Sequence, residues 1–409
     1  MLLFLLVLLL PSQLSHHFWP SWSLINGIRS DYLSPTLYLT DLIILGLMIF
    51  SSITFRKNTT SVLRATPSYL GGGRGVVLII LITLNIFFST NPQASIYKWI
   101  RVYEYYWLFK YLVNNIRYSV FSVRFGLSLA VVWTSFLAWS QFIIQHSIGG
   151  LWYWLGERTF SVSTLGISRI FLGFGNWELG FVLRPYATMP HPNALAGFLL
   201  VGGLLILSIT PRPPLNLRGG VRRTEVIYWL AVLSAFLTIP LTFSKSAILI
   251  EIGLIIFWLV RKYSKLLLVL FIVPMVLYFY LPSSPDSIPE RIVLNQKAVE
   301  TIKSNPVFGV GLGNSVSLLP SLRQPTHNVF LLLMVELGLP VILAIGYWSI
   351  AVGKKLLRTK NYELITIALV VLATGMVDHY WITLHQNILL LVVLLALTKV
   401  QLMTKNDNI

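Results

Sequence analysis

The 409-residue sequence contains no cysteine, and only 14 of its residues are Asp or Glu. Without cysteine the chain can have neither a disulfide, nor a thiolate metal site, nor a cysteine nucleophile. Charged residues make up 11% of the chain, whereas an ordinary soluble domain has about 25%. This shortage of charge excludes an ordinary soluble globular protein and indicates a chain that is surrounded by lipid.

Apolar residues take the place of the missing charge and account for 56% of the sequence. They fall into runs of roughly the length that is needed to cross a hydrocarbon core. The sequence therefore predicts an all-α, polytopic integral membrane protein with about twelve transmembrane helices. The clearest runs are residues 37–55, 75–90, 120–146, 193–210, 226–243, 246–260, 264–281, 327–352, 361–377 and 384–400.

Two further segments complete the expected count of about twelve. Residues 98–113 have the length of a span, although charged residues such as Lys98 and Arg101 interrupt them. Residues 1–10 are similar to the apolar part of a signal peptide, but they lack a preceding positive segment and a clear small-residue cleavage site. We therefore expect an uncleaved first helix that spans the membrane.

The excess of basic residues, a net charge of +17, marks topology and does not indicate a nucleic-acid surface. Most Lys and Arg residues fall into five groups, one at every second loop between the predicted spans. The positive-inside rule assigns these loops to the cytoplasm, so one alternating topology satisfies all five groups at once. The groups begin at Arg56, Arg117, Arg212, Arg261 and Lys354. The long loops on the other face are then residues 12–36, 147–192 and 282–326.

This topology divides the chain into three parts. Residues 1–183 form an N-terminal transmembrane bundle, in which the aromatic-rich stretch 150–180 is expected at the membrane interface. Residues 184–350 form the candidate catalytic region and include the extracytoplasmic loop 282–326. Residues 351–409 supply the C-terminal transmembrane helices.

Several basic residues remain on the outer face, where the positive-inside rule expects few, and an anionic ligand is the natural reason. Arg184 precedes the span at 193, Lys245 lies in a tight turn between two spans, and Arg291 follows in the long loop. A guanidinium group is a planar fork that suits two phosphate oxygens, whereas Lys is a point charge. Each of these side chains could instead be an anchor at a helix end or on a solvated face.

His327 is the strongest candidate for chemistry, because a neutral imidazole can take a proton from a hydroxyl near neutral pH. It lies at the outer start of the predicted span 327–352. A single His at a membrane interface is commonly structural, so the catalytic hypothesis depends on the three cations that are expected on the same face. Residues expected to support the site are His191, Asn193, Asn328, Glu336 and Asp378.

Two of these acids lead to different expectations. Glu336 lies inside the predicted span, where an ionisable side chain is costly and therefore suggests a function. Asp378 stands beside His379, with His385 nearby, but these residues lack a metal-ligand spacing. We therefore predict neither a metal site nor a cofactor.

Three glycines, Gly309, Gly311 and Gly313, follow a segment at 289–303 that has helical periodicity. No strand precedes the glycines, so they do not form a nucleotide-binding fingerprint. We expect them to allow a tight backbone path past a ligand or a neighbouring helix.

In their order along the chain, these residues resemble the O-antigen ligase and O-antigen polymerase superfamily. The resemblance covers roughly residues 184–345, and the spacing from His327 to Gly338 is similar to the His, ten residues, Gly pattern of the ligase branch. The motifs are Arg184 before His191-Pro192-Asn193, the pair Ser244-Lys245, then Arg291, Pro306, the run Gly309-Val310-Gly311-Leu312-Gly313, His327-Asn328 and Glu336-Leu337-Gly338.

The resemblance implies a metal-independent glycosyltransferase on the outer face of the bacterial cytoplasmic membrane. Such an enzyme takes a glycan from an undecaprenyl-diphosphate carrier and passes it to a hydroxyl of a glycan, lipid or protein acceptor. Carried over to this chain, Arg184, Arg291 and Lys245 would hold the diphosphate and His327 would be the general base. Lys245 departs from the pattern, because many members have Arg after the Ser.

Two alternatives stay open at this point. One is a polymerase of the O-antigen or exopolysaccharide type, which would use the same donor chemistry. The other is a transporter whose basic outer cavity binds an anionic lipid or solute. A transporter should show related halves and helices broken near the membrane midplane, whereas the polar residues here gather on one face. The sequence therefore favours the enzyme.

Overall fold

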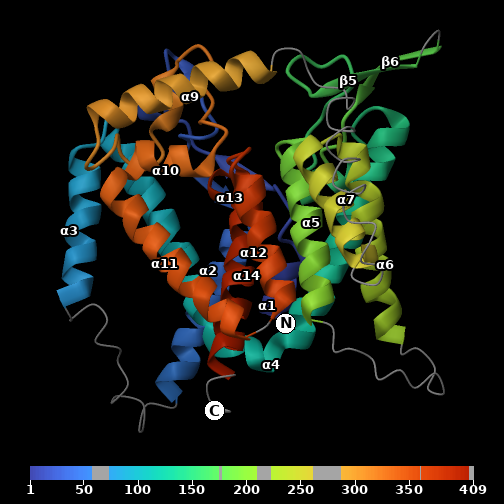
Figure 1. The fold of residues 1–409 in the computed structure, drawn as a ribbon, viewed down its shortest axis with the longest axis horizontal. Coiled ribbons are helices and arrows are strands. Elements are labelled where there is room, and N and C mark those ends of the chain that lie inside the picture. The colour runs from blue at the N-terminus through green and yellow to red at the C-terminus, as the bar shows by residue number, and fades with distance from the viewer. Residues whose placement is uncertain (58–72, 175–176, 210–222, 261–286, 360, 405–409) are drawn as a thin grey trace.

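The computed structural model describes residues 1–57, 73–174, 177–209, 223–260, 287–359 and 361–404. The fold is mostly helical (Figure 1). Among the described residues, five helices are long and apolar enough to cross a membrane, and three shorter apolar helices accompany them. The protein is therefore a helical membrane protein, while the predicted number of twelve spans stays a prediction. The expected span at 264–281 lies outside the described residues.

Most expected spans coincide with helices, because each is a continuous apolar stretch that ends at polar or helix-breaking residues. The described helices outside the candidate loops are α1 (Leu2–Leu8), α2 (Leu39–Lys57), α3 (Gly73–Phe87), α4 (Pro92–Ile144), α5 (Pro192–Ile209), α6 (Arg223–Thr238), α7 (Lys245–Val260), α11 (Leu339–Thr359), α12 (Tyr362–Gly375) and α14 (His385–Thr404). Helix α1 covers only seven residues, which is short of a full crossing, so the expected first span is not seen as one.

Helix α4 corrects the predicted loop around Arg117. Its 53 residues run without a break through both segments that were expected to be separate spans. At 1.5 Å per residue it is about 80 Å long, far more than a hydrocarbon core of about 30 Å. In Figure 1 it descends, passes along the lower edge and rises again. The two predicted crossings are thus joined by helix. Arg124, in this joining region, is buried with its guanidinium 3.4 Å from the centre of the Tyr228 ring.

The predicted span 327–352 is wrong in one respect, because it is two helices. Helix α10 (Val329–Leu337) ends before Gly338, and α11 begins at Leu339. Gly338 has a φ of 80°, and a side chain there would overlap the carbonyl of Val307. The break is therefore caused by the glycine-rich segment packing against the helix junction, where Leu339 N–H donates to the Pro306 carbonyl at 2.8 Å.

Short strands correct the all-α prediction. Strand β1 (Ser15–His17) pairs antiparallel with β4 (Thr36–Tyr38), and β2 (Leu24–Ile25) pairs with β3 (Ile28–Arg29). The aromatic stretch at 150–180 contains a 3-10 turn at Gly150–Leu155 and most of the hairpin β5 (Arg169–Phe174) and β6 (Trp177–Leu183). The helix expected at 289–303 is confirmed as α9 (Ser287–Ser304), which lies across the upper end of the bundle in Figure 1.

Helix α5 is the centre of the packing. Most of its residues are buried, and it contacts α4, α6, α7, α12 and α14. The helix ends beside the basic stretches, such as the last turns of α2, α5 and α11, point to the lower end in Figure 1. The positive-inside rule assigns that end to the cytoplasm. Helix α9, helix α10 and the short helix α13 (Tyr380–Thr383) gather at the opposite end, where the start of α5 also lies.

Candidate functional site

The turn between α12 and α13 is the centre of the candidate site, because side chains from four segments converge on it. Its Asp378 is buried, with 6% of its surface exposed. Asp378 Oδ1 accepts a hydrogen bond from the backbone N–H of His379 at 2.8 Å, and Oδ2 accepts one from Asn193 Nδ2 at 2.9 Å. Asn193 belongs to the first turn of α5, so the turn is fixed to the central helix.

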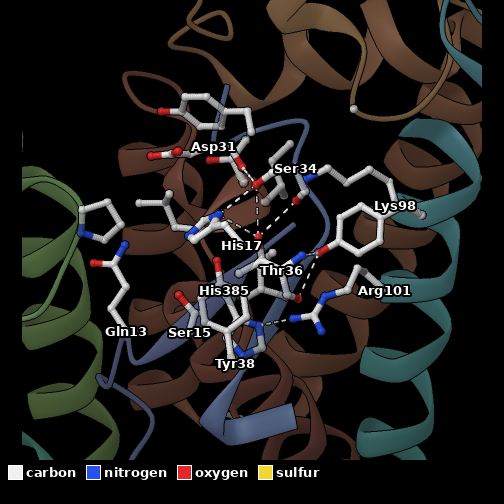
Figure 2. Close-up of a pocket in the computed structure, with 18 of the residues that line it drawn as sticks. Gln13, Ser15, His17, Asp31, Ser34, Thr36, Tyr38, Lys98, Arg101 and His385 are labelled. Carbon is white, nitrogen blue, oxygen red and sulfur yellow. Dashed lines mark hydrogen bonds between the residues drawn. The ribbon is translucent and has the colours of Figure 1, made fainter. Parts of the chain in front are cut away.

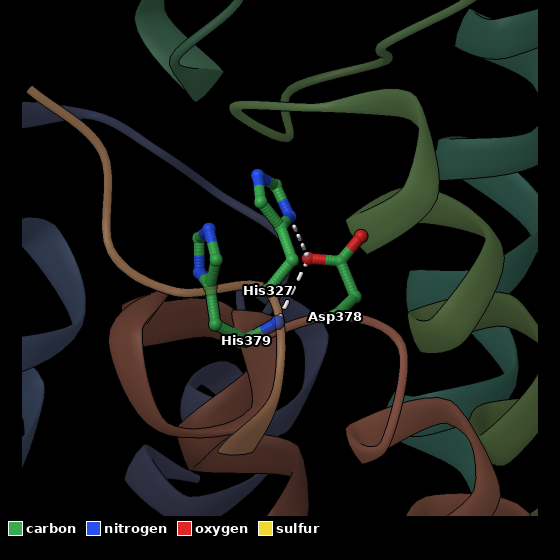
Figure 3. A group of neighbouring side chains, drawn as sticks. All are labelled: His327, Asp378 and His379. Atoms are coloured by element: carbon green, nitrogen blue, oxygen red, sulfur yellow. Dashed lines mark hydrogen bonds and ion pairs between the residues drawn. The ribbon is translucent and has the colours of Figure 1, made fainter. Parts of the chain in front are cut away.

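His327 stands against this carboxylate (Figure 3). Its Nδ1 lies 3.5 Å from Asp378 Oδ1, a contact that lacks the geometry of a hydrogen bond and that a small ring rotation would close. Its Nε2 lies 3.3 Å from the amide oxygen of Gln324. A carboxylate on Nδ1 favours the tautomer that carries its proton there, which leaves the Nε2 lone pair as the basic site. With that tautomer, the Gln324 amide must turn its N–H towards Nε2.

Arg184 is connected to the same carboxylate through Asn193. Its Nη2 donates to Asn193 Oδ1 at 2.7 Å, its Nε to the Thr242 carbonyl at 2.7 Å, and its Nη1 to Ser168 Oγ at 2.9 Å. The amide of Asn193 thus accepts from the cation with its oxygen and donates to Asp378 with its nitrogen. Three of the five guanidinium N–H groups are used in this way, and two remain for a ligand.

Arg291 and Asn328 hold the turn from the other side. Arg291, in the first turns of α9, donates from Nη1 to the carbonyl of Val377 at 2.8 Å. Asn328 donates from Nδ2 to the carbonyl of Met376 at 3.0 Å. With its Oδ1, Asn328 caps α10 by accepting from the first backbone N–H groups of that helix. These contacts bring α9 and α10 to the turn that carries Asp378.

The charges in this site are set mainly by burial. Burial would raise the pKa of the Asp378 carboxyl, but the contact with His327 and the neighbouring His379 hold it well below its ordinary value. Burial lowers the pKa of His379 to about 3, so this ring is neutral at neutral pH. Burial also lowers the pKa of Arg184 to about 10, and the guanidinium stays charged at neutral pH. The site therefore combines the ionised carboxylate of Asp378, the charged guanidinium of Arg184 and the neutral imidazole of His379.

The structure does not bring every candidate residue to this turn. His191 is exposed but near the turn, since it interacts electrostatically with Arg184 and Asp378, and its Nδ1 accepts from the backbone N–H of Asn193 at 3.1 Å. Lys245 and Glu336 are the residues that lie apart. Lys245 begins α7, three residues after Thr242, whose carbonyl binds Arg184. Glu336 lies at the end of α10, where Oε1 accepts from Ser315 Oγ at 2.6 Å. Its place is thus in a separate polar region, beside the glycine-rich turn.

His379 is the residue that sequence reasoning left out of the site. Its ring centre lies 4.8 Å from that of His327, and its Nδ1 lies 2.7 Å from Thr383 Oγ1. Its position next to Asp378 in the sequence was the available signal. Ser168, which contacts Arg184, gave no signal, because serines are common in outer loops.

His327, Asp378 and His379 are also the group among the described residues that could hold a metal ion, with ligand atoms within 4.8 Å of one another. In the structure His379 Nδ1 contacts Thr383 and Asp378 Oδ1 accepts a backbone N–H. A structural zinc site has four protein ligands and a catalytic one has three with an open position. The three residues match the number of protein ligands in a catalytic zinc site.

A second ionic cluster joins α2, α4 and α14. Arg101 donates to Asp41 at 2.8 Å, to Glu104 at 2.6 Å and to His385 Nδ1 at 2.6 Å. Because Arg can only donate, His385 Nδ1 must accept, and the ring carries its proton on Nε2. That nitrogen faces Thr40 Oγ1 at 2.7 Å. Asp41 and His385 therefore belong to this cluster.

The geometry as a whole offers a base, a carboxylate that orients it, and two guanidinium groups at one turn. Such a set can accept a proton from a hydroxyl and stabilise negative charge that develops on a leaving group. A model of the O-antigen ligase family matches residues 230–346. No curated protein matches the chain. Residues 230–346, which include Arg291 and His327, are thus an O-antigen ligase family domain within a chain that has several candidate membrane spans.

Proposed function

We propose that this protein is a glycosyltransferase that moves a glycan from an undecaprenyl-diphosphate carrier to an acceptor hydroxyl. The site would face the outer side of the bacterial cytoplasmic membrane, opposite the helix ends that border the basic stretches. The observation that carries the proposal is the linkage of His327, Asp378, Asn193 and Arg184, because one network then contains both a base and a cation. Both halves of a glycosyl transfer need such groups.

In the proposed reaction, Asp378 orients His327 so that Nε2 receives the proton of the acceptor hydroxyl. The acceptor oxygen forms a bond to the anomeric carbon of the donor glycan. The bond from that carbon to the phosphate oxygen breaks, and its electron pair leaves with the lipid diphosphate. Arg184 and Arg291 stabilise the charge that grows on the diphosphate, since fixed cations in a site sheltered from water stabilise a transition state strongly.

The two arginines suit this task because each keeps N–H groups that donate to no atom of the described residues. Arg184 has two N–H groups left after its three contacts, and Arg291 has four left after its contact with Val377. Bidentate pairs between guanidinium and phosphate are short and strong. Lys245 is proposed as a further point charge at the edge of the same face, and His191, Asn328 and Glu336 as supporting residues.

The test uses the purified protein in lipid nanodiscs with an undecaprenyl-diphosphate-linked glycan and a glycan acceptor, in the presence of EDTA. We expect release of lipid diphosphate in step with glycan transfer. Lys297→Ala, on the exposed face of α9, is the matched control and should keep full turnover. No release in any lipid composition would refute the enzyme, and donor movement across the bilayer without release would favour the transporter.

The products of the same assay separate the ligase from the polymerase. A ligase adds one donor glycan to a chemically different acceptor. A polymerase joins donor glycans to one another, so it lengthens the lipid-linked chain when no other acceptor is added. Product size by gel electrophoresis therefore decides between the two.

A further inference from the structure

A cavity of about 550 Å³ lies next to the proposed catalytic site (Figure 2). It is bounded by the N-terminal strands, the first turns of α4, the glycine-rich turn and the junction of α13 with α14. Small-molecule sites have volumes of about 300–1,000 Å³, so the cavity has the size of a ligand site. Most of its lining lies outside the O-antigen ligase family domain.

The cavity reaches residues that contact His379, the neighbour of the proposed base His327. Thr383, which lines it, contacts His379 Nδ1 at 2.7 Å, and the ring of Tyr32 lies 5.8 Å from the ring of His379. Pro325, also in the lining, stands two residues before His327. Arg184 and Arg291 do not line the cavity. It is therefore a separate site beside His379, whose ring centre lies 4.8 Å from that of His327, and the two arginines are not part of it.

The walls of the cavity carry groups that bind sugars. His17 Nδ1 contacts Ser34 Oγ at 2.8 Å and Thr36 Oγ1 at 3.1 Å, which places hydroxyls and an imidazole along one wall. Tyr97 and other tyrosines offer ring faces and phenol groups. The side-chain oxygen of Gln13 is buried and has no hydrogen-bond partner among the described residues. A buried acceptor without a partner is costly, so a ligand hydroxyl would satisfy it.

Charged residues of both signs line the cavity, and Lys98 is one of its cations. The charged lining residues are Lys98, Arg101, Arg158, Asp31, Glu157 and Glu336. The side chain of Lys98 extends from α4 into the cavity, and its ammonium forms no hydrogen bond or ion pair with any described residue. The neighbouring cation Arg101 is different, because Asp41 and Glu104 neutralise it. Glu336 also lines the cavity and attracts Lys98 electrostatically, but its Oε1 accepts from Ser315 and the two side chains form no ion pair.

The glycine-rich turn is shaped to admit this lysine. Gly313 has a φ of 84°, and a Cβ at this position would overlap the aliphatic stem of Lys98. The sequence predicted that these glycines allow a close backbone approach. Gly313 does so, and the group that it admits is the side chain of Lys98. An ammonium in a partly buried site gains most from an anionic partner.

We infer that this cavity is the acceptor site and that it binds a saccharide carrying an anionic group, which Lys98 holds. The anionic group is a carboxylate, as in a uronic acid, or a phosphate ester on the sugar. The inference rests on the proposed function, since the acceptor hydroxyl must reach His327. It narrows the acceptor from any hydroxyl to that of an acidic sugar.

Binding is tested without turnover, by saturation-transfer difference NMR on the protein in nanodiscs. The probes are D-glucuronate, glucose 6-phosphate and D-glucose. We expect stronger signals from at least one anionic sugar than from glucose, and the two anionic probes distinguish carboxylate from phosphate. Lys98→Met should weaken the binding of that sugar about tenfold or more, whereas Lys98→Arg and the control Lys297→Met should keep it. The inference would be overturned if glucose bound as tightly as both anionic sugars, or if Lys98→Met left the affinity for the anionic sugar unchanged.

Gly313→Ala provides a second test, since the added methyl displaces Lys98 without removing its charge. We expect it to weaken anionic-sugar binding about as much as Lys98→Met does, and unchanged binding by the folded variant would overturn the inference. The two proposals fail separately. If lipid-diphosphate release depends on His327 but sugar binding does not depend on Lys98, the proposed enzyme stands and the acceptor site is refuted. If the sugar binds through Lys98 but no lipid diphosphate is released, the sugar site stands and the proposed enzyme is refuted.

Discussion

Replacing Asp378 by Asn removes the carboxylate that orients His327 and keeps nearly the same volume. The ionised carboxylate accepts from Asn193 and from the backbone of His379, and it faces His327 Nδ1 at 3.5 Å. An amide can present its oxygen to only one side, so its NH₂ group must face either Asn193 or the side of His327, where it would also displace the hydrogen bond from the backbone N–H of His379. Facing His327, it would donate to Nδ1 and force the proton onto Nε2, which is the atom proposed to act as base.

The expected loss follows from this change of tautomer. General-base catalysis contributes about 10²–10⁴-fold to rate, which corresponds to about 2.7–5.4 kcal/mol of transition-state stabilisation at 1.36 kcal/mol per tenfold. Asp378→Asn should therefore lower kcat for glycan transfer by about 10²–10⁴-fold. Donor affinity should change little, because the arginines stay in place.

The assay is the initial rate of lipid-diphosphate release, measured for Asp378→Asn, His327→Ala and the double variant. Residues that act as one unit are not additive, so the double variant should be no slower than His327→Ala alone. A thermal unfolding curve shows that each variant is folded. A kcat for Asp378→Asn within threefold of wild type, or a double variant slowed by the product of the two single effects, would refute the reasoning.

Three other changes test the surrounding structure. Asn193→Ala breaks the contacts with both Arg184 and Asp378. We therefore expect kcat to fall and the donor Kd to rise about tenfold, which is about 1.4 kcal/mol of binding free energy. A change in kcat alone, or in donor Kd alone, would show that Asn193 does not couple Arg184 to Asp378. Gly338→Ala should lower the free energy of unfolding by about 1–3 kcal/mol, the range for a strained backbone, because Gly338 has a positive φ and the Val307 carbonyl leaves no room for a side chain. The control is Gly346→Ala on α11, where a side chain meets no neighbour, and it should change the melting temperature little. Burial lowers the pKa of His379 to about 3, so as pH falls the imidazole is protonated in the unfolded chain before it is protonated in the folded protein. The contribution of neutral His379 to stability is therefore complete above about pH 6.5. It is lost as pH falls towards 3, by up to about 1.4 kcal/mol per pH unit. Melting temperatures from pH 7 to pH 4 should therefore fall less steeply in His379→Gln than in wild type, and equal slopes would contradict this assignment.

Local patterns predicted the elements that depend on local properties. The period of apolar residues at 289–303 gave α9, and apolar length gave the positions of most spans. The break at Gly338 could not be predicted in this way, because both sides of it are equally apolar and its cause is a distant segment, Pro306 to Gly309, that packs there. The continuity of α4 was missed since charged residues in a helix and in a loop look alike when only hydropathy is read.

The same distinction holds for the site. Arg184, Arg291 and His327 were predicted from charge and topology, which place them on one face. The contact between Asn193 and Asp378 joins residues 185 positions apart, and no local pattern indicates such a distance. Glu336 was expected to support the site because an ionisable side chain inside a predicted span suggests a function, whereas in the structure it contacts Ser315 and lines the cavity.

The most direct test of the proposed base is a single-turnover experiment with the lipid-diphosphate donor already bound and acceptor added. His327→Ala should bind the donor with wild-type Kd, because Arg184 and Arg291 are intact, and it should transfer glycan at least about 10²-fold more slowly. Transfer by His327→Ala at the wild-type rate would contradict the account.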